Sequence, residues 1–316
     1  MHRSPPCLAT LALLTALSAL TLNMFLPSLP AMARELGARE SVVALALSGY
    51  MLVTAAFQLV LGPLSDRLGR RPVMLGALAV YVLASAGCML APDVHTLLAC
   101  RMAQGVVIAG MVLSSAVIRD QFDARDAAAR MGSISSAMAV APMLGPMVGG
   151  LLDTLLGWRA VFGLYTAMGA ALWLLVWRDM GETRRPGAGG PRAADFAALL
   201  GSPRYMAYVL CAAFSVGAFY VFVTGVPYVA TAVWGLSPAQ VGVGVGSITA
   251  GFMLGATITA RLAARRGFRR LIGAGRAMSL VAMAVALALF AAGATHPLWL
   301  FGLTLFVGLG NGLTLP

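Results

Sequence analysis

The chain consists of about ten long apolar stretches separated by short polar segments. A helix of about 20 apolar residues crosses a hydrocarbon core about 30 Å thick. Inside the bilayer each span must satisfy its own backbone hydrogen bonds, which a helix does. The sequence therefore predicts an all-α membrane protein with about ten transmembrane helices. The stretches fall at 8–30, 43–63, 73–91, 96–118, 131–153, 159–178, 206–230, 241–261, 271–293 and 297–316.

Composition and the distribution of charge support this class and orient the spans. Hydrophobic residues make up 60% of the 316 residues and charged residues only 10%, whereas soluble domains carry about 25% charged residues. The net charge of +11 arises from arginine-rich turns that alternate with turns holding only Arg34, Arg39 and Arg159. This bias predicts that the N-terminus and the arginine-rich turns are cytoplasmic. It also explains the positive charge without a nucleic-acid partner.

Residues 62–72 read GPLSDRLGRRP and separate the second and third apolar stretches. We expect this signature segment to be a short basic hairpin loop at the membrane surface. It resembles the loop signature of the major facilitator superfamily, Gly-x-Leu-x-Asp-Arg-x-Gly-Arg-Arg. Every position of that signature is filled, by Gly62, Leu64, Asp66, Arg67, Gly69, Arg70 and Arg71.

The resemblance implies a fold of two six-helix repeats related by an axis along the membrane normal. The chain then divides into a six-span half at 1–180, a Gly- and Pro-rich cytoplasmic linker at 181–204, and a second half at 205–316. This second half has four spans where the plan implies six, so we expect it to be incomplete. A fragment of a longer product and a truncated remnant both remain open.

Four further segments resemble the bicyclomycin/chloramphenicol-resistance (Bcr/CflA) branch of drug–proton antiporters: MFLPSLPAMARELG (24–37), RMAQG (101–105), APMLGPMVGG (141–150) and YVLCAAFSVGAFYVFVTGVPYV (208–229). The resemblance implies a monomeric multidrug exporter of the bacterial inner membrane. It would move small amphiphilic substrates by alternating access, with the proton gradient as energy source and no cofactor or metal. A nutrient or metabolite facilitator and a non-transporting remnant are the alternatives. An enzyme is disfavoured, because no nucleophile–base pair, metal-ligand cluster or phosphate loop is evident.

The signature segment and the fifth span hold two groups of candidate residues. The resemblance implies that Asp66 helps to lock a cytoplasmic gate against the eleventh span, while the alternative is that the arginines only fix topology and bind lipid headgroups. We expect Gly62 and Gly69 to permit a turn and close backbone approach. In the fifth span, small residues and prolines predict a bent helix with a flat packing face. The resemblance implies an antiporter motif there, and packing without motion is the alternative. The residues concerned are Pro142, Gly145, Pro146, Gly149 and Gly150, with Gly242, Gly244, Gly246, Gly251 and Gly255 of the eighth span as the partner face.

Arg101 is a charge inside the fourth span, and an intramembrane charge indicates function by default. The resemblance aligns Arg101, Gln104 and Gly105 with a motif linked to proton coupling, whereas snorkelling to the interface is the alternative. The family usually has an acid where this chain has Asn23, and an amide cannot titrate. Since Asn23 and Arg101 lie at similar depths, we predict that they hydrogen-bond and that coupling through a first-span carboxylate is absent.

The seventh span is rich in aromatic residues: Phe214, Phe219, Tyr220, Phe222 and Tyr228. Such rings suit an apolar drug pocket, because they supply contact area without demanding one ligand shape. Contact with lipid or with neighbouring helices is the alternative for each ring.

Overall fold

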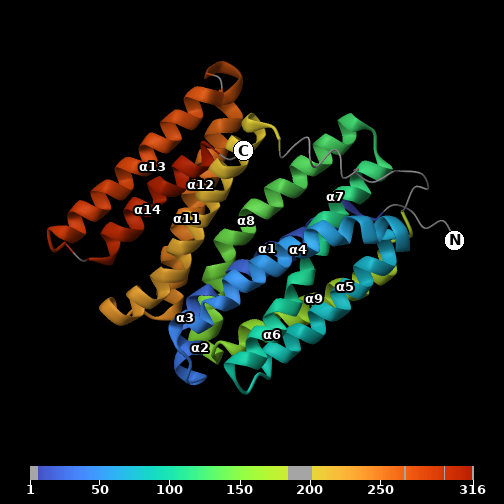
Figure 1. The fold of residues 1–316 in the computed structure, drawn as a ribbon, viewed down its shortest axis with the longest axis horizontal. Coiled ribbons are helices and arrows are strands. Elements are labelled where there is room, and N and C mark those ends of the chain that lie inside the picture. Colours follow the sequence, from blue (N-terminus) through green and yellow to red (C-terminus); the bar gives the residue numbers. More distant parts are fainter. Residues whose placement is uncertain (1–5, 184–200, 267, 295, 315–316) are drawn as a thin grey trace.

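The computed structural model describes residues 6–183, 201–266, 268–294 and 296–314, and all regular secondary structure in these ranges is helical (Figure 1). Within these ranges, eight helices are long and apolar enough to cross a membrane. Two shorter apolar helical segments, Leu144–Leu156 and Pro297–Gly312, add to them. The predicted all-α membrane architecture is therefore confirmed.

The helices form two groups that follow the chain. The first group comprises α1 (Leu8–Asn23), η1 (Leu26–Ser28), α2 (Leu29–Glu35), α3 (Glu40–Val43), α4 (Leu45–Leu68), α5 (Arg70–Met89), α6 (Val94–Gln104), η2 (Gly105–Ile108), α7 (Ala109–Gln121), α8 (Ala124–Leu156) and α9 (Arg159–Asp179). The second comprises α11 (Pro203–Trp234), α12 (Pro238–Arg266), α13 (Phe268–Ala291) and α14 (Pro297–Gly312). Most of the predicted linker, residues 184–200, lies outside the described residues.

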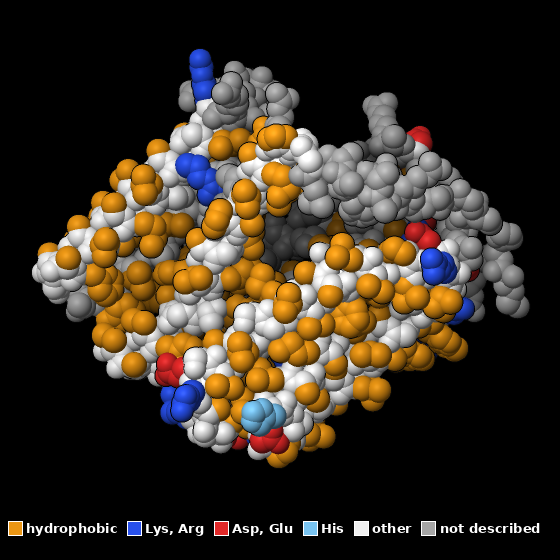
Figure 2. All heavy atoms as spheres, in the orientation of Figure 1, with side chains coloured by type: hydrophobic (Ala, Val, Ile, Leu, Met, Phe, Trp, Pro, Cys, Tyr) orange, Lys and Arg blue, Asp and Glu red, His pale blue; other side chains and the backbone are white. Residues whose placement is uncertain are grey.

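The two groups meet mainly along α8 and α12, which pack against each other. Within the first group α5 packs on α9 and α1 on α8, and within the second α14 packs on α12 and α13. In Figure 1 the groups converge at the end that holds α2 and α3 and separate toward the opposite end. Figure 2 shows the surface hollowed between them, with hydrophobic side chains along its walls.

The first apolar stretch is a broken helix. α1 ends at Asn23, the 3₁₀ turn η1 follows, and α2 begins at Leu29. Pro27 and Pro30 lack the backbone N–H that a continuous helix would use, so the hydrogen-bond ladder cannot run through this segment. The fourth stretch is interrupted in a similar way, because η2 separates α6 from α7. η1 contacts α8 and also α11 and α12, so the first break lies where the two groups meet.

The prediction of an eleven-residue hairpin loop at 62–72 is wrong. Helix α4 continues through Leu68 and α5 begins at Arg70, so Gly69 alone makes the turn, with φ +104°. Gly62 is helical, and a Cβ placed there would meet nothing within 4 Å. Polar residues continue a helix past the end of its apolar stretch, because they remain good helix formers once the chain reaches water. Of the two glycines, only Gly69 is needed for a turn and a close approach.

Candidate functional site

A fully buried arginine lies beside the break in the first span. The Arg101 side chain is 0% exposed. Its Nη2 donates to the carbonyl oxygen of Thr21 at 2.6 Å, its Nη1 to Oε1 of Gln104 at 2.8 Å, and its Nε to the carbonyl oxygen of Ala46 at 3.2 Å. These three acceptors belong to α1, α6 and α4. The guanidinium thus joins three helices at one point.

Two aromatic rings enclose the guanidinium, and hydroxyl groups surround it. The Arg101 Cζ atom lies 4.1 Å from the centre of the Phe25 ring and 4.3 Å from that of Tyr50. Such cation–π contacts are strongest where water is excluded. The outer residues are linked by hydrogen bonds from Gln104 Nε2 to Ser85 Oγ (2.7 Å), between Thr21 Oγ1 and Tyr81 Oη (2.8 Å), and from Tyr165 Oη to the carbonyl oxygen of Leu20 (3.1 Å). We call these residues, with Arg101, the Arg101 cluster.

The charge of Arg101 is stabilised without a carboxylate. The ion pairs of Arg70 with Asp66 and Asp120, and of Arg159 with Glu35, do not involve Arg101. Burying an arginine is costly unless its N–H groups are satisfied. Here two backbone carbonyls, an amide oxygen and two ring faces meet that requirement.

The predicted hydrogen bond between Asn23 and Arg101 is not formed. Asn23 Nδ2 donates to the carbonyl oxygen of Ala19 at 2.8 Å, and the guanidinium takes the three acceptors given above. Asn23 is the last residue of α1, and its amide bonds within its own helix rather than to α6. The Asn23 side chain instead interacts with the Tyr220 hydroxyl on α11. Asn23 therefore faces the second group of helices.

The glycines of α8 bring this helix onto the break and onto α12. A Cβ added at Gly149 would overlap the carbonyl oxygen of Met24, and one added at Gly150 would overlap that of Pro238. A Cβ at Gly242 would overlap the carbonyl of Pro146. At Gly145 an added Cβ would lie 3.5 Å from the Asn23 Cβ, in ordinary contact. The side chain of Pro142 lies outside the described residues.

The predicted partner face on the eighth span is correct at one glycine and wrong at three others. Gly242 faces α8, as expected. Gly244 faces the ring of Phe301, while Gly251 and Gly255 face the α14 backbone at Leu305 and Leu309. Since α12 is helical, glycines spaced along it point in different directions. The small residues therefore serve two interfaces.

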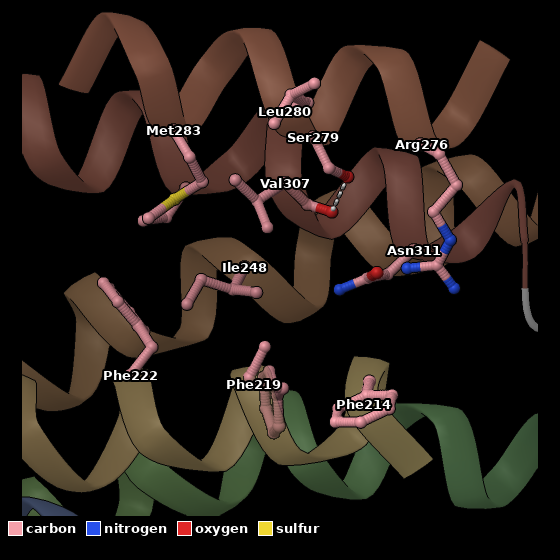
Figure 3. A pocket seen from close by; sticks show the side chains of 12 residues that line it. Phe214, Phe219, Phe222, Ile248, Arg276, Ser279, Leu280, Met283, Val307 and Asn311 are labelled. Atoms are coloured by element: carbon pink, nitrogen blue, oxygen red, sulfur yellow. Dashed lines mark hydrogen bonds between the residues drawn. The ribbon is translucent and has the colours of Figure 1, made fainter. Parts of the chain in front are cut away.

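The aromatic residues of α11 line two cavities rather than one. Phe214, Phe219 and Phe222 form a wall of a pocket of about 470 Å³ inside the second group, and Arg276 and Asn311 lie together at one end of it (Figure 3). Tyr220 and Tyr228 line a cleft of about 480 Å³ between α11 and the α3–α4 segment, with residues that include Leu47, Ser48, Met51 and Thr224. Only this second cavity lies between the two groups of helices.

Residues of the signature segment form ion pairs and hydrogen bonds with the ends of several helices. Arg70 pairs with Asp66 (2.7 Å) and with Asp120 at the end of α7 (3.2 Å). The Arg70 backbone N–H donates to Glu182 Oε1 at 2.9 Å, just beyond α9. Arg71 donates to the Trp177 carbonyl oxygen at 2.8 Å. Arg67 lies exposed in the last turn of α4.

Comparison with known proteins identifies the class. Membrane-spanning helices in two groups, packed together along α8 and α12, define a multi-pass membrane protein. The model of the Major Facilitator Superfamily matches residues 11–316. The chain belongs to this superfamily.

Three relatives show moderate identity. An uncharacterized MFS-type transporter, YdgK, of Bacillus subtilis is 34% identical over 258 residues, covering 78% of this chain and 64% of that protein. The chloramphenicol resistance protein of Pseudomonas aeruginosa is 36% identical over 218 residues, covering 67% and 51%. Multidrug resistance protein D of Escherichia coli is 30% identical over 211 residues, covering 66% and 54%. The chain thus spans about half to two thirds of the length of these relatives.

Solved structures support the fold. A bacterial homolog of the human lysosomal transporter Spinster, in an inward-facing and occupied conformation, superposes with a TM-score of 0.79 at 17% identity, covering 97% of this chain and 71% of that one. A D-xylose–proton symporter superposes with a TM-score of 0.75 at 13% identity, covering 97% and 80%. These low identities establish the architecture and leave the substrate open.

Proposed function

We propose that this protein exports small amphiphilic compounds, antibiotics among them, across the bacterial inner membrane by alternating access. The cleft between α11 and the α3–α4 segment carries the proposal. Its walls combine apolar side chains, hydroxyl groups and the rings of Tyr220 and Tyr228, which suits ligands that are partly apolar and partly polar. The relatives named for chloramphenicol and multidrug resistance support the substrate class, and we assign the chain to the Bcr/CflA branch on its sequence motifs.

We further propose that the N-terminus and the signature segment are cytoplasmic and that the protein acts as a monomer. The arginine bias of the sequence supports the orientation. With this orientation, the two groups of helices converge at the outer end of the molecule and separate toward the cytoplasm (Figure 1). The conformation would then accept substrate from the cytoplasmic side. The Asp66–Arg70–Asp120 ion pairs would strengthen the cytoplasmic ends of α4, α5 and α7.

For coupling to protons, Asn23 offers no titratable group in the first span. Asp153 is the one acidic residue that is buried among the described residues, with 9% of its surface exposed. It lies on α8 one turn beyond Gly149 and Gly150, beside the broken first span. We propose that Asp153 carries the coupling proton if export is driven by the proton gradient. An Asp153→Asn variant is then expected to lose the pH dependence of export, whereas an unchanged pH profile would remove this role.

The export proposal is tested in bacteria that lack their own drug exporters. Cells expressing the native gene are expected to accumulate less chloramphenicol and less of a lipophilic dye than cells with an empty vector. Collapsing the proton gradient should abolish the difference. If expression leaves drug accumulation unchanged and instead increases uptake of a sugar, nucleoside or other metabolite, the nutrient-facilitator alternative is correct and drug export is wrong.

A further inference from the structure

The break in the first span leaves the Thr21 carbonyl among those without their helical donor. In a continuous α-helix the N–H of Phe25 would bond the carbonyl of Thr21. The backbone bonds at the break run instead from Met24 N to the Leu20 oxygen and from Ser28 N to the Phe25 oxygen, each 2.9 Å. No backbone N–H reaches the Thr21 oxygen among these bonds. An unsatisfied carbonyl inside a membrane protein costs several kcal/mol.

Arg101 supplies the missing donor. Its Nη2 lies 2.6 Å from the Thr21 oxygen, the shortest of its three hydrogen bonds. The hydroxyl of Tyr165 lies 3.3 Å from the same oxygen. A positive charge at the C-terminal end of a helix also interacts favourably with the helix dipole, and α1 ends two residues after Thr21. The guanidinium therefore occupies the place of a C-terminal cap on α1.

Further contacts hold the Arg101 side chain in its position at the end of α1. Its Nε donates to the Ala46 carbonyl oxygen on α4, and its Cζ atom lies over the rings of both Phe25 and Tyr50. Phe25 belongs to the break itself. A planar guanidinium can donate in three directions and stack on both faces at once, which the point charge of a lysine cannot do.

We infer that Arg101 is a positioning residue that caps the broken first span and thereby holds Asn23 toward Tyr220 at the interface between the two groups of helices. It neither contacts substrate nor carries a proton. Complete burial separates it from the cleft, and arginine does not deprotonate in proteins. The inference concerns the backbone at residues 20–29 and does not depend on which substrate is transported.

Hydrogen–deuterium exchange of the 316-residue chain in nanodiscs tests this role. Arg101→Gln removes the charge-assisted bond to Thr21, and we expect exchange at residues 24–29 to rise roughly 10- to 100-fold. Arg101→Lys should give an intermediate increase, because it restores the charge but only part of the geometry. Ser114→Ala is the matched control: it removes another buried hydrogen bond from the fourth span to α1, at the Leu11 carbonyl, 3.3 Å away, and should leave residues 24–29 unchanged.

The outcomes separate a cap from other roles. Wild-type exchange in Arg101→Gln would overturn the inference, as would wild-type exchange in Arg101→Lys, which would show that charge alone suffices. An equal rise in every helix would indicate general destabilisation and would also overturn it. In the native transporter, Arg101→Lys should lower the maximal rate and leave the pH of half-maximal transport unchanged. A shifted pH profile would make Arg101 part of the coupling machinery and would contradict a purely positioning role.

Discussion

Replacing Gly149 by alanine is predicted to force α8 away from the broken first span. The added Cβ would overlap the Met24 carbonyl oxygen, far inside the 3.4 Å at which ordinary contact begins. Because the obstacle is backbone, no side chain can turn aside to make room. Overpacking of this kind costs about 1–3 kcal/mol. Alanine is favoured over glycine inside a helix by about 0.8–1 kcal/mol, so the net loss is about 0–2 kcal/mol.

Gly145→Ala is the matched control, one helical turn earlier on the same face. Its added Cβ lies 3.5 Å from the Asn23 Cβ, an ordinary contact, so the helix-propensity gain should dominate. Thermal unfolding of the two purified variants in the same detergent measures the difference. We expect the midpoint of Gly145→Ala to equal or exceed that of the wild type and the midpoint of Gly149→Ala to fall below it. Equal or higher midpoints for both variants would refute the close approach of α8 to Met24.

Three further predictions concern the helix ends and the topology. The pKa of the Asp93 carboxyl is lowered, chiefly by the backbone N–H of Thr96 and then by its hydroxyl, so its stabilisation of α6 is complete above about pH 4 and is lost as the pH falls through the lowered pKa. Asp93→Ala should therefore lower the unfolding midpoint at pH 7 and have a smaller effect at pH 2, and an equal effect at both would contradict this. Glu182→Ala removes the acceptor for the first backbone N–H of α5 and should speed amide exchange in its first turn, at a cost of about 0.5–1 kcal/mol; unchanged exchange would show that the contact is dispensable. Reporter fusions at Gly189 and Ser237 should score as cytoplasmic and external, and the reverse pattern would overturn the orientation.

The spans themselves were predictable because hydropathy over about 20 residues is a strong signal. The ends of the helices were less predictable. α4 runs to Leu68 and α8 begins at Ala124, beyond the apolar stretches, since polar residues extend a helix into water. For the same reason, residues 62–72, which were predicted as a loop, form the end of α4, a one-residue turn at Gly69 and the start of α5. Only the positive φ of Gly69 marks that turn.

The site could be predicted only in part. A charge within an apolar stretch singled out Arg101, and Gln104 followed from the motif. The aromatic partners of Arg101, Phe25 and Tyr50, were missed, because isolated aromatic residues in apolar spans resemble ordinary packing. The pairing with Asn23 was wrong because helix rise gives depth and not direction. The direction in which Asn23 points depends on how α1 and α6 are rotated about their axes, and depth alone carries no measure of that rotation.

The central claim is that the two groups of helices move against each other during transport, and the α8–α12 contact tests it most directly. The backbone N–H of Ala239 donates to Thr154 Oγ1 at 3.2 Å across this contact, so cysteines at the two positions would lie close together. In a native transporter stripped of its own cysteines, the Thr154→Cys/Ala239→Cys pair should export drug when reduced. It should stop when a disulfide joins the two helices and resume on reduction. Full export with the disulfide quantitatively formed would contradict alternating access at this interface.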